Sequence, residues 1–271
     1  MNSAFTTLDW AGRAVSIEHQ WIAPTLRLAQ GERGGEAPLI VFLHEGLGSL
    51  SMWRDFPQRL CAAAGARGLV YSRPGYGRST PRDRGEAWGT DFMHRQAHEV
   101  LPALLDALGV QQPVWLFGHS DGGSIALLYA SRFSDRVQGA IVLAPHIVVE
   151  DISVESIAKM RAAYRQTDLR ERLARHHDDP DSAFWGWNNI WLHPPFKQWS
   201  IDQEIASITR PLLAVQGIDD EYGTLAQIRG INERVPKTRL LELPDCGHSP
   251  HRDQPDRVIA ASVAFMQKTW T

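Results

Sequence analysis

The chain has 271 residues, of which 43% are apolar and 22% charged, with 28 Lys and Arg against 31 Asp and Glu. This length is enough for one large hydrophobic core, and we expect one domain with an insertion. The net charge of −3 leaves no excess of basic side chains to neutralise phosphates, so nucleic acid is not an expected partner. The longest apolar stretches have the length of a strand, whereas a membrane span needs about 18 to 20 residues. A membrane partner is therefore not expected either.

The N-terminal segment and the cysteines favour a cytoplasmic protein. Residues 1–16 have neither a basic start followed by an apolar block nor a small-residue cleavage site, as a secretion signal would. Cys61 and Cys246 cannot form a disulfide framework, and their spacing suits no zinc site. We expect a small-molecule substrate as the partner and no cofactor or metal, and the oligomeric state is left open.

Strand patterns follow one another along most of the chain. Residues 15–19 and 25–29 alternate in polarity and predict a hairpin-like antiparallel start. The later strands lack strict alternation, as parallel strands buried on both faces do. They are expected at residues 39–44, 68–72, 113–118, 139–144, 212–217 and 239–243. Because helical patterns separate them, the sequence predicts an α/β fold with a mostly parallel, doubly wound sheet and helices on both faces.

The clearest helical pattern runs from Asp91 to a capping glycine at Gly109, with apolar residues at three- and four-residue spacing. Pro102 lies inside this pattern and predicts a kink or an early turn. The final helix is expected to begin near Asp253.

One region, residues 145–210, breaks the alternation. It contains helical patterns but no convincing strand, which predicts a helical insertion over the sheet. The expected division is therefore a core of residues 1–144 and 211–271 and a helical cap insertion of residues 145–210. Four of the ten tryptophans lie in this insertion: Trp185, Trp187, Trp191 and Trp199.

A candidate nucleophile follows the expected strand at residues 113–118. The sequence Gly118-His119-Ser120-Asp121-Gly122 has the form Gly-x-Ser-x-Gly, and a helical pattern follows it. A serine on a sharp strand-to-helix turn needs small residues two positions before and after it, because a Cβ there would collide with backbone. The turn also places the backbone N–H of Asp121 at a helix N-terminus, where it can donate to an oxyanion. The alternative is a glycine-rich turn with a capping serine.

A serine nucleophile needs a histidine base and an acid to orient it. His248 follows the last expected strand and so lies at the same edge of the sheet as Ser120, with His251 as its rival. Asp220 follows the strand at residues 212–217, in a run of three acids that could instead be solvated charge or helix caps. The chain order Ser120, Asp220, His248 is the order of the α/β-hydrolase triad.

These motifs resemble those of the α/β-hydrolase superfamily over nearly the whole chain from residue 39 onward. The resemblance implies an eight-stranded type of sheet, favours Asp220 over Asp219 as the acid, and makes the insertion the cap over the pocket. The matching motifs are His44 to Ser49 with Trp53 downstream, Ser72 to Ser79, Gly118 to Gly122, Gly217 to Asp220, and Gly247-His248 with Pro255.

The chain departs from the family pattern at two positions. Most relatives have His-Gly where this chain has His44-Glu45, so the second oxyanion donor is expected to be the N–H of Gly46, with that of Leu47 as the alternative. A carboxylate would oppose negative charge there, so Glu45 is expected to point away, toward Arg73, or else to contact a polar group of the substrate. Ser72 replaces a common Asp, which we interpret as neutral for the chemistry.

The predicted function is that of a serine hydrolase that forms an acyl-enzyme with a small carboxylic ester or thioester bearing an apolar or aromatic part. Lactone opening and carbon–carbon bond hydrolysis use the same triad and stay open. A non-catalytic ligand-binding protein on this fold is the alternative of another class.

Candidate substrate contacts come from the cap and from loops at the active edge of the sheet. The cap tryptophans either line an apolar pocket or form the insertion's own core. The run His176 to Asp179 is interpreted as a solvated helix end rather than a metal site, because adjacent histidines point apart. The candidates are Glu45, His146, Trp185, Trp187, Trp191 and Tyr222.

Overall fold

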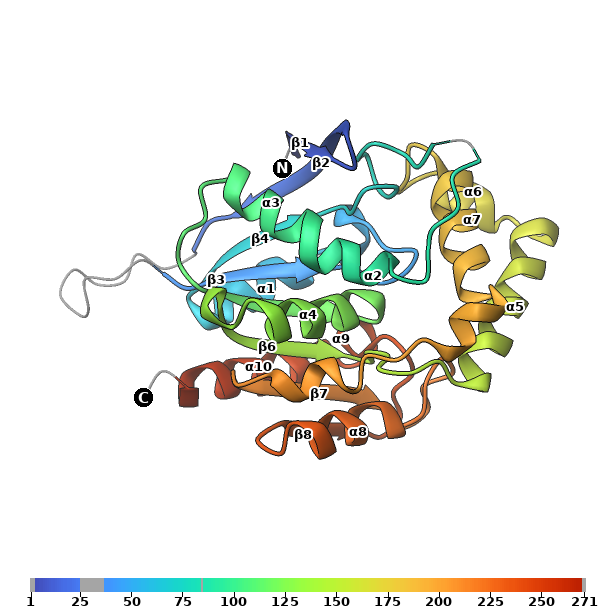
Figure 1. Ribbon diagram of the computed structural model, residues 1–271. Helices are drawn as coiled ribbons and strands as arrows, with labels where there is room; N and C mark the ends of the chain where they lie inside the picture. Colours follow the sequence, from blue (N-terminus) through green and yellow to red (C-terminus); the bar gives the residue numbers. More distant parts are fainter. Residues whose placement is uncertain (1–2, 25–36, 84, 270–271) are drawn as a thin grey trace.

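The computed structural model describes residues 3–24, 37–83 and 85–269, and they form one eight-stranded sheet with helices on both sides (Figure 1). The strand order is β1-β2-β4-β3-β5-β6-β7-β8. The strands are β1 Ala4–Trp10, β2 Arg13–Ile22, β3 Leu39–Leu43, β4 Arg67–Tyr71, β5 Val114–His119, β6 Val137–Leu143, β7 Leu212–Gly217 and β8 Arg239–Leu243.

Strands β3 to β8 pair in parallel, while β2 is antiparallel to both β1 and β4. The predicted α/β fold with a mostly parallel sheet is confirmed, and the six strands expected after residue 39 are found within two residues of their predicted bounds.

The antiparallel start differs from its prediction. Residues 15–19 belong to β2, but the partner strand is β1, which precedes them; residues 25–29 lie outside the described part of the chain. Only Leu8 of β1 is buried, and an exposed strand does not need the alternation of apolar and polar residues by which strands are predicted. The two-residue turn between β1 and β2 has positive φ at Ala11 (55°) and Gly12 (75°), which suits the twist of a tight hairpin.

Alternate side chains of the central strands enter two separate hydrophobic cores. Val41 and Leu116 face the core covered by α4 (Asp121–Arg132) and α8 (Ala226–Arg234). Phe42 and Phe117 face the core covered by α1 (Phe56–Ala64) and α10 (Pro255–Thr269). Because both faces of these strands are buried, their sequences are continuous apolar runs without polar alternation. The predicted doubly wound arrangement is confirmed.

The helix expected from Asp91 consists of three segments: α2 (Phe92–Arg95), a π-helical turn (Gln96–Val100) and α3 (Leu101–Ala107). Pro102 lies at the start of α3, directly after the π-helical turn, and has no N–H to donate to that preceding turn. The widened turn directly before it is the local adjustment to that proline. The last helix likewise has two parts, because Pro255 begins α10 after the short α9 (Pro250–Asp253).

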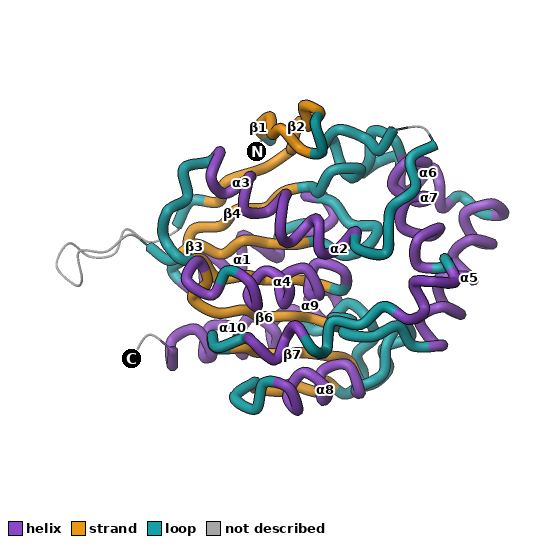
Figure 2. Tube along the Cα trace, in the orientation of Figure 1, coloured by secondary structure: helices purple, strands orange, loops and turns teal. Residues whose placement is uncertain are grey.

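Between β6 and β7 the chain forms helices beyond the carboxyl ends of the strands, where the arrowheads in Figure 1 point. We call residues 145–210 the cap. Its helices are purple in Figure 2, and its one described strand-like feature is an isolated bridge between Val148 and Ser200. The cap contains α5 (Asp151–Gln166), α6 (Leu169–Leu173), α7 (Pro180–Trp191) and 3-10 turns at Pro194–Gln198 and Glu204–Ser207.

Candidate active site

Ser120 lies on a strained turn between β5 and α4. Its φ of 53° and ψ of −122° place a non-glycine residue in a region that side chains rarely adopt. A Cβ on Gly118 would collide with the carbonyl of Gly122, and a Cβ on Gly122 would collide with the carbonyl of Leu43. The two glycines are therefore required by the close approach of the backbone segments, and the turn presents the hydroxyl at the carboxyl edge of the sheet.

His248 connects Ser120 to Asp220. Its Nε2 lies 2.9 Å from the Ser120 Oγ, and its Nδ1 lies 2.8 Å from the Asp220 Oδ1. The three residues follow β5, β7 and β8, so the parallel sheet brings together side chains from distant parts of the chain. This arrangement can move a proton from the hydroxyl to the imidazole while the carboxylate orients the ring.

Asp220 is held as a carboxylate. Its Oδ1 also accepts the backbone N–H of Tyr222 at 2.8 Å and that of Gly223 at 3.2 Å, and its Oδ2 accepts from the Gln216 Nε2 at 3.1 Å. Burial opposes ionisation, but the hydrogen bond with His248 and the backbone donors together hold the pKa of Asp220 below its usual value.

The rival histidine, His251, does not reach Ser120. Its ring is buried on α9 against Trp53, with centroids 4.9 Å apart, and against His119, with centroids 4.7 Å apart. His119 in turn contacts the loop of His248, because its Nε2 lies 2.7 Å from the carbonyl oxygen of His248. His251 and His119 thus pack behind the loop that carries His248.

Gly46 and Asp121 both border the cavity above Ser120, as does Leu47, the alternative to Gly46. Gly46 lies directly beneath the cap, since a Cβ on it would collide with the indole Nε1 of Trp187. Four residues further along α7, the indole N–H of Trp191 donates to the Asp121 Oδ1 at 3.2 Å. One face of α7 therefore contacts both loops that were predicted to supply oxyanion donors.

Glu45 borders the cavity, but its carboxylate does not pair with Arg73. Its carboxylate pairs with Arg252 at 3.0 Å and lies 3.6 Å from the Nδ1 of His119. Arg73 instead donates to the backbone carbonyl of Glu45 at 2.8 Å, so the expected side-chain pair with Arg73 is wrong. Burial raises the pKa of Glu45, but His119 and Arg252 outweigh it and hold that pKa well below its usual range.

Arg73 is a site residue whose role the sequence did not reveal. Its side chain is completely buried and lies over the Tyr76 ring, 4.7 Å from the centroid. One terminal nitrogen lies 3.9 Å from the Asp121 Oδ2, so the guanidinium touches both the loop of Glu45 and the turn of Ser120. Burial raises the pKa of Asp121 to about 6 even though Arg73 opposes the shift.

The cavity beside Ser120 has a volume of about 230 Å³ and mostly apolar walls. It brings together most of the expected substrate contacts, namely Glu45, His146, Trp187, Trp191 and Tyr222. The cap contributes Ile157, Met160, Leu169 and Leu173 as well. His146 is buried against Trp191, and this burial lowers its pKa to about 3, so the ring is neutral.

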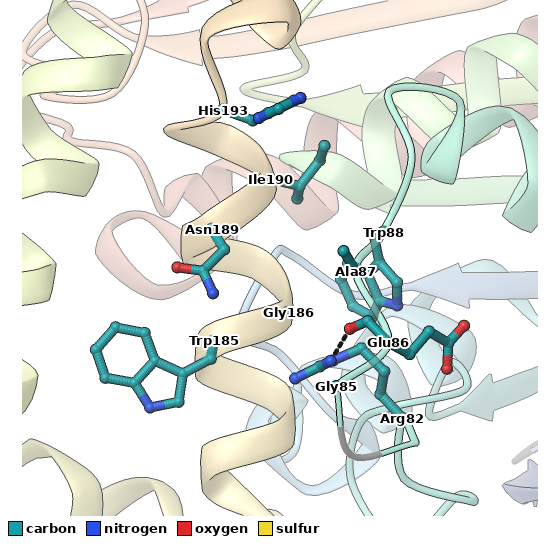
Figure 3. Close-up of a pocket in the computed structure, with 10 residues that line it drawn as sticks. All are labelled: Arg82, Gly85, Glu86, Ala87, Trp88, Trp185, Gly186, Asn189, Ile190 and His193. Carbon is teal, nitrogen blue, oxygen red and sulfur yellow. Dashed lines mark hydrogen bonds between the residues drawn. The ribbon is translucent and has the colours of Figure 1, made fainter.

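Trp185 does not line this cavity. It borders a separate groove between α7 and the segment that carries Arg82 and Trp88 (Figure 3). The Arg165 guanidinium covers its ring at 5.3 Å. Trp187 and Trp191 share a helix face at four-residue spacing, whereas Trp185 lies two residues from Trp187 and faces elsewhere. The spacing of these tryptophans in the sequence could therefore have separated Trp185 from the two that line the cavity.

His177 is buried rather than solvated, which corrects the interpretation of residues 176–179. Its Nδ1 accepts the backbone N–H of Gly77 at 2.9 Å, and its Nε2 lies 3.1 Å from the carbonyl oxygen of Leu47. The ring therefore joins the cap to two loops of the core. Within residues 3–24, 37–83 and 85–269, no group of three or more potential ligand residues is arranged to hold a metal ion. Over the same residues, no helix has the length and apolar character needed to cross a membrane.

Comparison with curated proteins and solved structures finds several hydrolases that are similar to this chain. Among curated proteins, a bifunctional esterase/perhydrolase of Acinetobacter calcoaceticus is 25% identical over 86% of this chain and 92% of its own. A 2-hydroxy-6-oxo-6-phenylhexa-2,4-dienoate hydrolase of Burkholderia cepacia is 22% identical over 86% of this chain and 88% of its own. Among solved structures, the enol-lactonase from Burkholderia xenovorans superposes with a TM-score of 0.70 at 22% identity, covering 97% of this chain and 100% of that one.

The family model of the alpha/beta hydrolases matches residues 40–261, which span the nucleophile turn, the cap and the loops of Asp220 and His248. This range covers most of the chain. The protein is a hydrolase that belongs to the alpha/beta hydrolase family.

Proposed function

We propose that the protein is a serine hydrolase that cleaves a small carboxylic ester or thioester with an apolar or aromatic part through an acyl-enzyme. The observation that carries this proposal is the continuous contact from the Ser120 Oγ through His248 to Asp220, with 2.9 and 2.8 Å between the paired atoms. A protein that only binds a ligand does not require a histidine base within hydrogen-bond distance of a serine on a strained turn, whereas a serine nucleophile does.

In the proposed reaction, the Ser120 Oγ attacks the acyl carbon while His248 Nε2 accepts its proton. Asp220 stabilises the resulting imidazolium, which then gives the proton to the leaving group. The N–H groups of Asp121 and Gly46 stabilise the oxyanion, a contribution of about 3 to 4 kcal/mol per donor. Water activated by His248 releases the acid and restores the serine.

The cavity walls favour an uncharged acyl part. The charged residues that border the cavity are Glu45, Asp121 and Glu221, and none of its described lining residues is Lys or Arg. A carboxylate placed there would lose its hydration without gaining a cation. The dienoates named for some relatives are carboxylates, so an oxo-dienoate substrate fits this cavity less well than a neutral ester.

A lactone is the second candidate, because it is an internal ester that the same three residues can open without a separate leaving group. The superposition with an enol-lactonase supports the fold needed for it. Comparing kcat/KM for nitrophenyl esters, thioesters and lactones of similar size separates the two candidates.

Covalent labelling tests the proposal itself. A fluorophosphonate probe is expected to label Ser120 in the wild-type protein and to leave Ser120→Ala unlabelled. Turnover of nitrophenyl esters should disappear in the same variant while its melting temperature stays within the range of the wild type. Labelling elsewhere, or unchanged turnover in Ser120→Ala, would reject the mechanism. A protein that binds these esters but neither labels nor turns them over would be a receptor.

A further inference from the structure

Three arginine side chains at the junction of the cap and the core have no anionic partner. Arg54, Arg78 and Arg175 are exposed, and in the described part of the chain none of them forms an ion pair or a side-chain hydrogen bond. Most other described arginines are paired, for example Arg59 with Asp256 and Arg170 with Asp181. Exposed guanidinium groups that lie close together create a positive potential that attracts anions.

Two of these arginines, Arg78 and Arg175, line one hollow, which we call the arginine groove. Its walls include Arg78 from the turn after β4 and Arg175 from the segment after α6, with Ser51 and His176 between them. The Ser51 Oγ lies 2.8 Å from the His176 Nδ1, so a core residue and a cap residue close one side of the groove. Its volume is about 520 Å³, and most of its lining residues are polar or charged.

Positive charge dominates this hollow. Partial burial and the charges of nearby Arg252, Arg54 and Arg175 lower the pKa of His176, which lines the groove. The one carboxylate among the described lining residues is Glu18, and its Oε2 is already bound by the Ser72 hydroxyl at 2.8 Å and the Arg78 N–H at 3.0 Å. Arg252 is neutralised by Glu45, which leaves Arg78 and Arg175 in the groove wall for a ligand, with Arg54 near His176.

The arginine groove and the cavity of Ser120 are lined by neighbouring residues of the same two chain segments. Ser51 lines the groove, and the next residue, Met52, lines the cavity. On the cap side Leu173 lines the cavity, and Arg175 lines the groove two residues later. An extended substrate that passes between these two segments would place an apolar acyl group at Ser120 and an anionic group at the arginines.

We propose that the arginine groove binds phosphate groups on the leaving-group side of the substrate, so that the substrate is an acyl ester or thioester of a phosphate-bearing small molecule. This inference rests on the proposed function and adds the chemistry of the leaving group to it. Arginine suits this task because its planar guanidinium donates two parallel hydrogen bonds to phosphate oxygens. The largely apolar cavity, whose described lining contains no Lys or Arg, and the arginine groove then select the two ends of one molecule: an uncharged acyl group and a charged carrier.

Binding is tested on the full chain with coenzyme A as the phosphate-bearing probe and pantetheine as its phosphate-free counterpart. Calorimetry should show that coenzyme A binds at least about tenfold more tightly than pantetheine, because charged hydrogen bonds to phosphate are strong. Raising the ionic strength should reduce this difference, since exposed charges are screened by salt. Equal affinities for the two probes would overturn the inference.

The arginines are tested with the double variant Arg78→Ala/Arg175→Ala. It should lose the preference for coenzyme A, while Arg78→Lys/Arg175→Lys should retain part of it. The matched control is Arg172→Ala, which removes an exposed cap arginine that pairs with Asp168 and lines neither hollow. A preference that survives the double alanine variant, or disappears in the control, would contradict the assignment.

Kinetics link the groove to the reaction. The KM for a coenzyme A thioester should rise about tenfold in the double alanine variant, while that for the N-acetylcysteamine thioester of the same acyl group should stay unchanged. If inorganic pyrophosphate binds as tightly as coenzyme A and does not raise the KM of the coenzyme A thioester, the groove is an anion site unconnected to the substrate, and the inference fails. Failure of the proposed function looks different, because no ester of any kind would then be turned over.

Discussion

The core and the cap contribute to the cavity beside Ser120 in different ways. In the core, Ser120, Asp220 and His248 follow strands whose carboxyl ends must meet, and Gly118 and Gly122 are imposed by backbone contacts. In the cap, Trp187 and Trp191 reach the cavity only through the rotation of α7 about its axis and its packing on the core. Sequence motifs therefore identify the core's contribution, whereas the cap's contribution depends on tertiary packing.

The largest expected effect tests the core alone. Asp220→Asn should lower kcat by on the order of 10⁴-fold, because the amide cannot stabilise the imidazolium and favours the wrong tautomer of His248. The melting temperature should change far less, since the backbone donors at residues 222 and 223 can still bond to the amide oxygen. Steady-state kinetics with a nitrophenyl ester measure this loss, and a drop smaller than tenfold would remove Asp220 from the triad.

A second variant tests the contact between the two regions. Gly46→Ala places a methyl group against the Trp187 indole, so it should displace the loop or the cap and lower kcat/KM by about 10²-fold. Shortening the opposing side chain, as in Gly46→Ala/Trp187→Ala, should restore part of the kcat lost by the single variant. The matched control is Trp187→Ala alone; if its kcat falls as far as that of Gly46→Ala, the clash is not the cause.

The histidines buried near the cap predict a dependence of stability on pH. The folded-state pKa of His146 is lowered to about 3 and that of His177 to about 4, both chiefly by burial, whereas unfolded histidine has a pKa near 6.5. Between these values the unfolded state binds more protons, so stability rises with pH up to about 7 and is lost as the pH falls.

Denaturant titrations between pH 5 and 7 measure this dependence. His146→Gln should reduce the slope by up to about 1.4 kcal/mol per pH unit, the effect of one proton. An unchanged slope in His146→Gln would mean that this ring is protonated in the folded state.

The smallest expected effect on activity is that of Trp185→Ala, which is compared with Trp187→Ala on the same helix. Trp185→Ala should leave KM and kcat unchanged, because Trp185 borders the groove of Figure 3 rather than the cavity of Ser120. Its cost in unfolding free energy should include about 0.5 to 1 kcal/mol from the lost contact with Arg165. A rise in KM as large as that of Trp187→Ala would place Trp185 at the substrate.

The sequence predicted the central sheet and the meeting of Ser120, Asp220 and His248 at its edge, because both depend on local patterns. Buried strands carry continuous apolar runs, and the nucleophile turn needs glycine at fixed positions. The strand β1 was missed because only Leu8 of it is buried, and its turn uses Ala11 where Asn or Gly is usual.

The remaining errors concern the direction of side chains. Glu45 was expected to pair with Arg73, yet the loop directs its carboxylate to Arg252, 207 positions further along the chain. His177 was expected in solvent, yet it accepts the N–H of Gly77, 100 positions earlier. Such choices are decided between segments that meet only after folding, so no pattern within either segment reveals them.

The burial of Arg73 has a consequence for how pH acts on this protein. A guanidinium stays protonated at every pH at which proteins remain folded, and this one is closed off from solvent between the loop of Glu45 and the turn of Ser120. Its positive charge therefore sits in the interior, where salt screens it little. Neighbouring Asp121, whose pKa is about 6, is the member of this pair whose charge changes, so mild acid converts a balanced interior into a positive one.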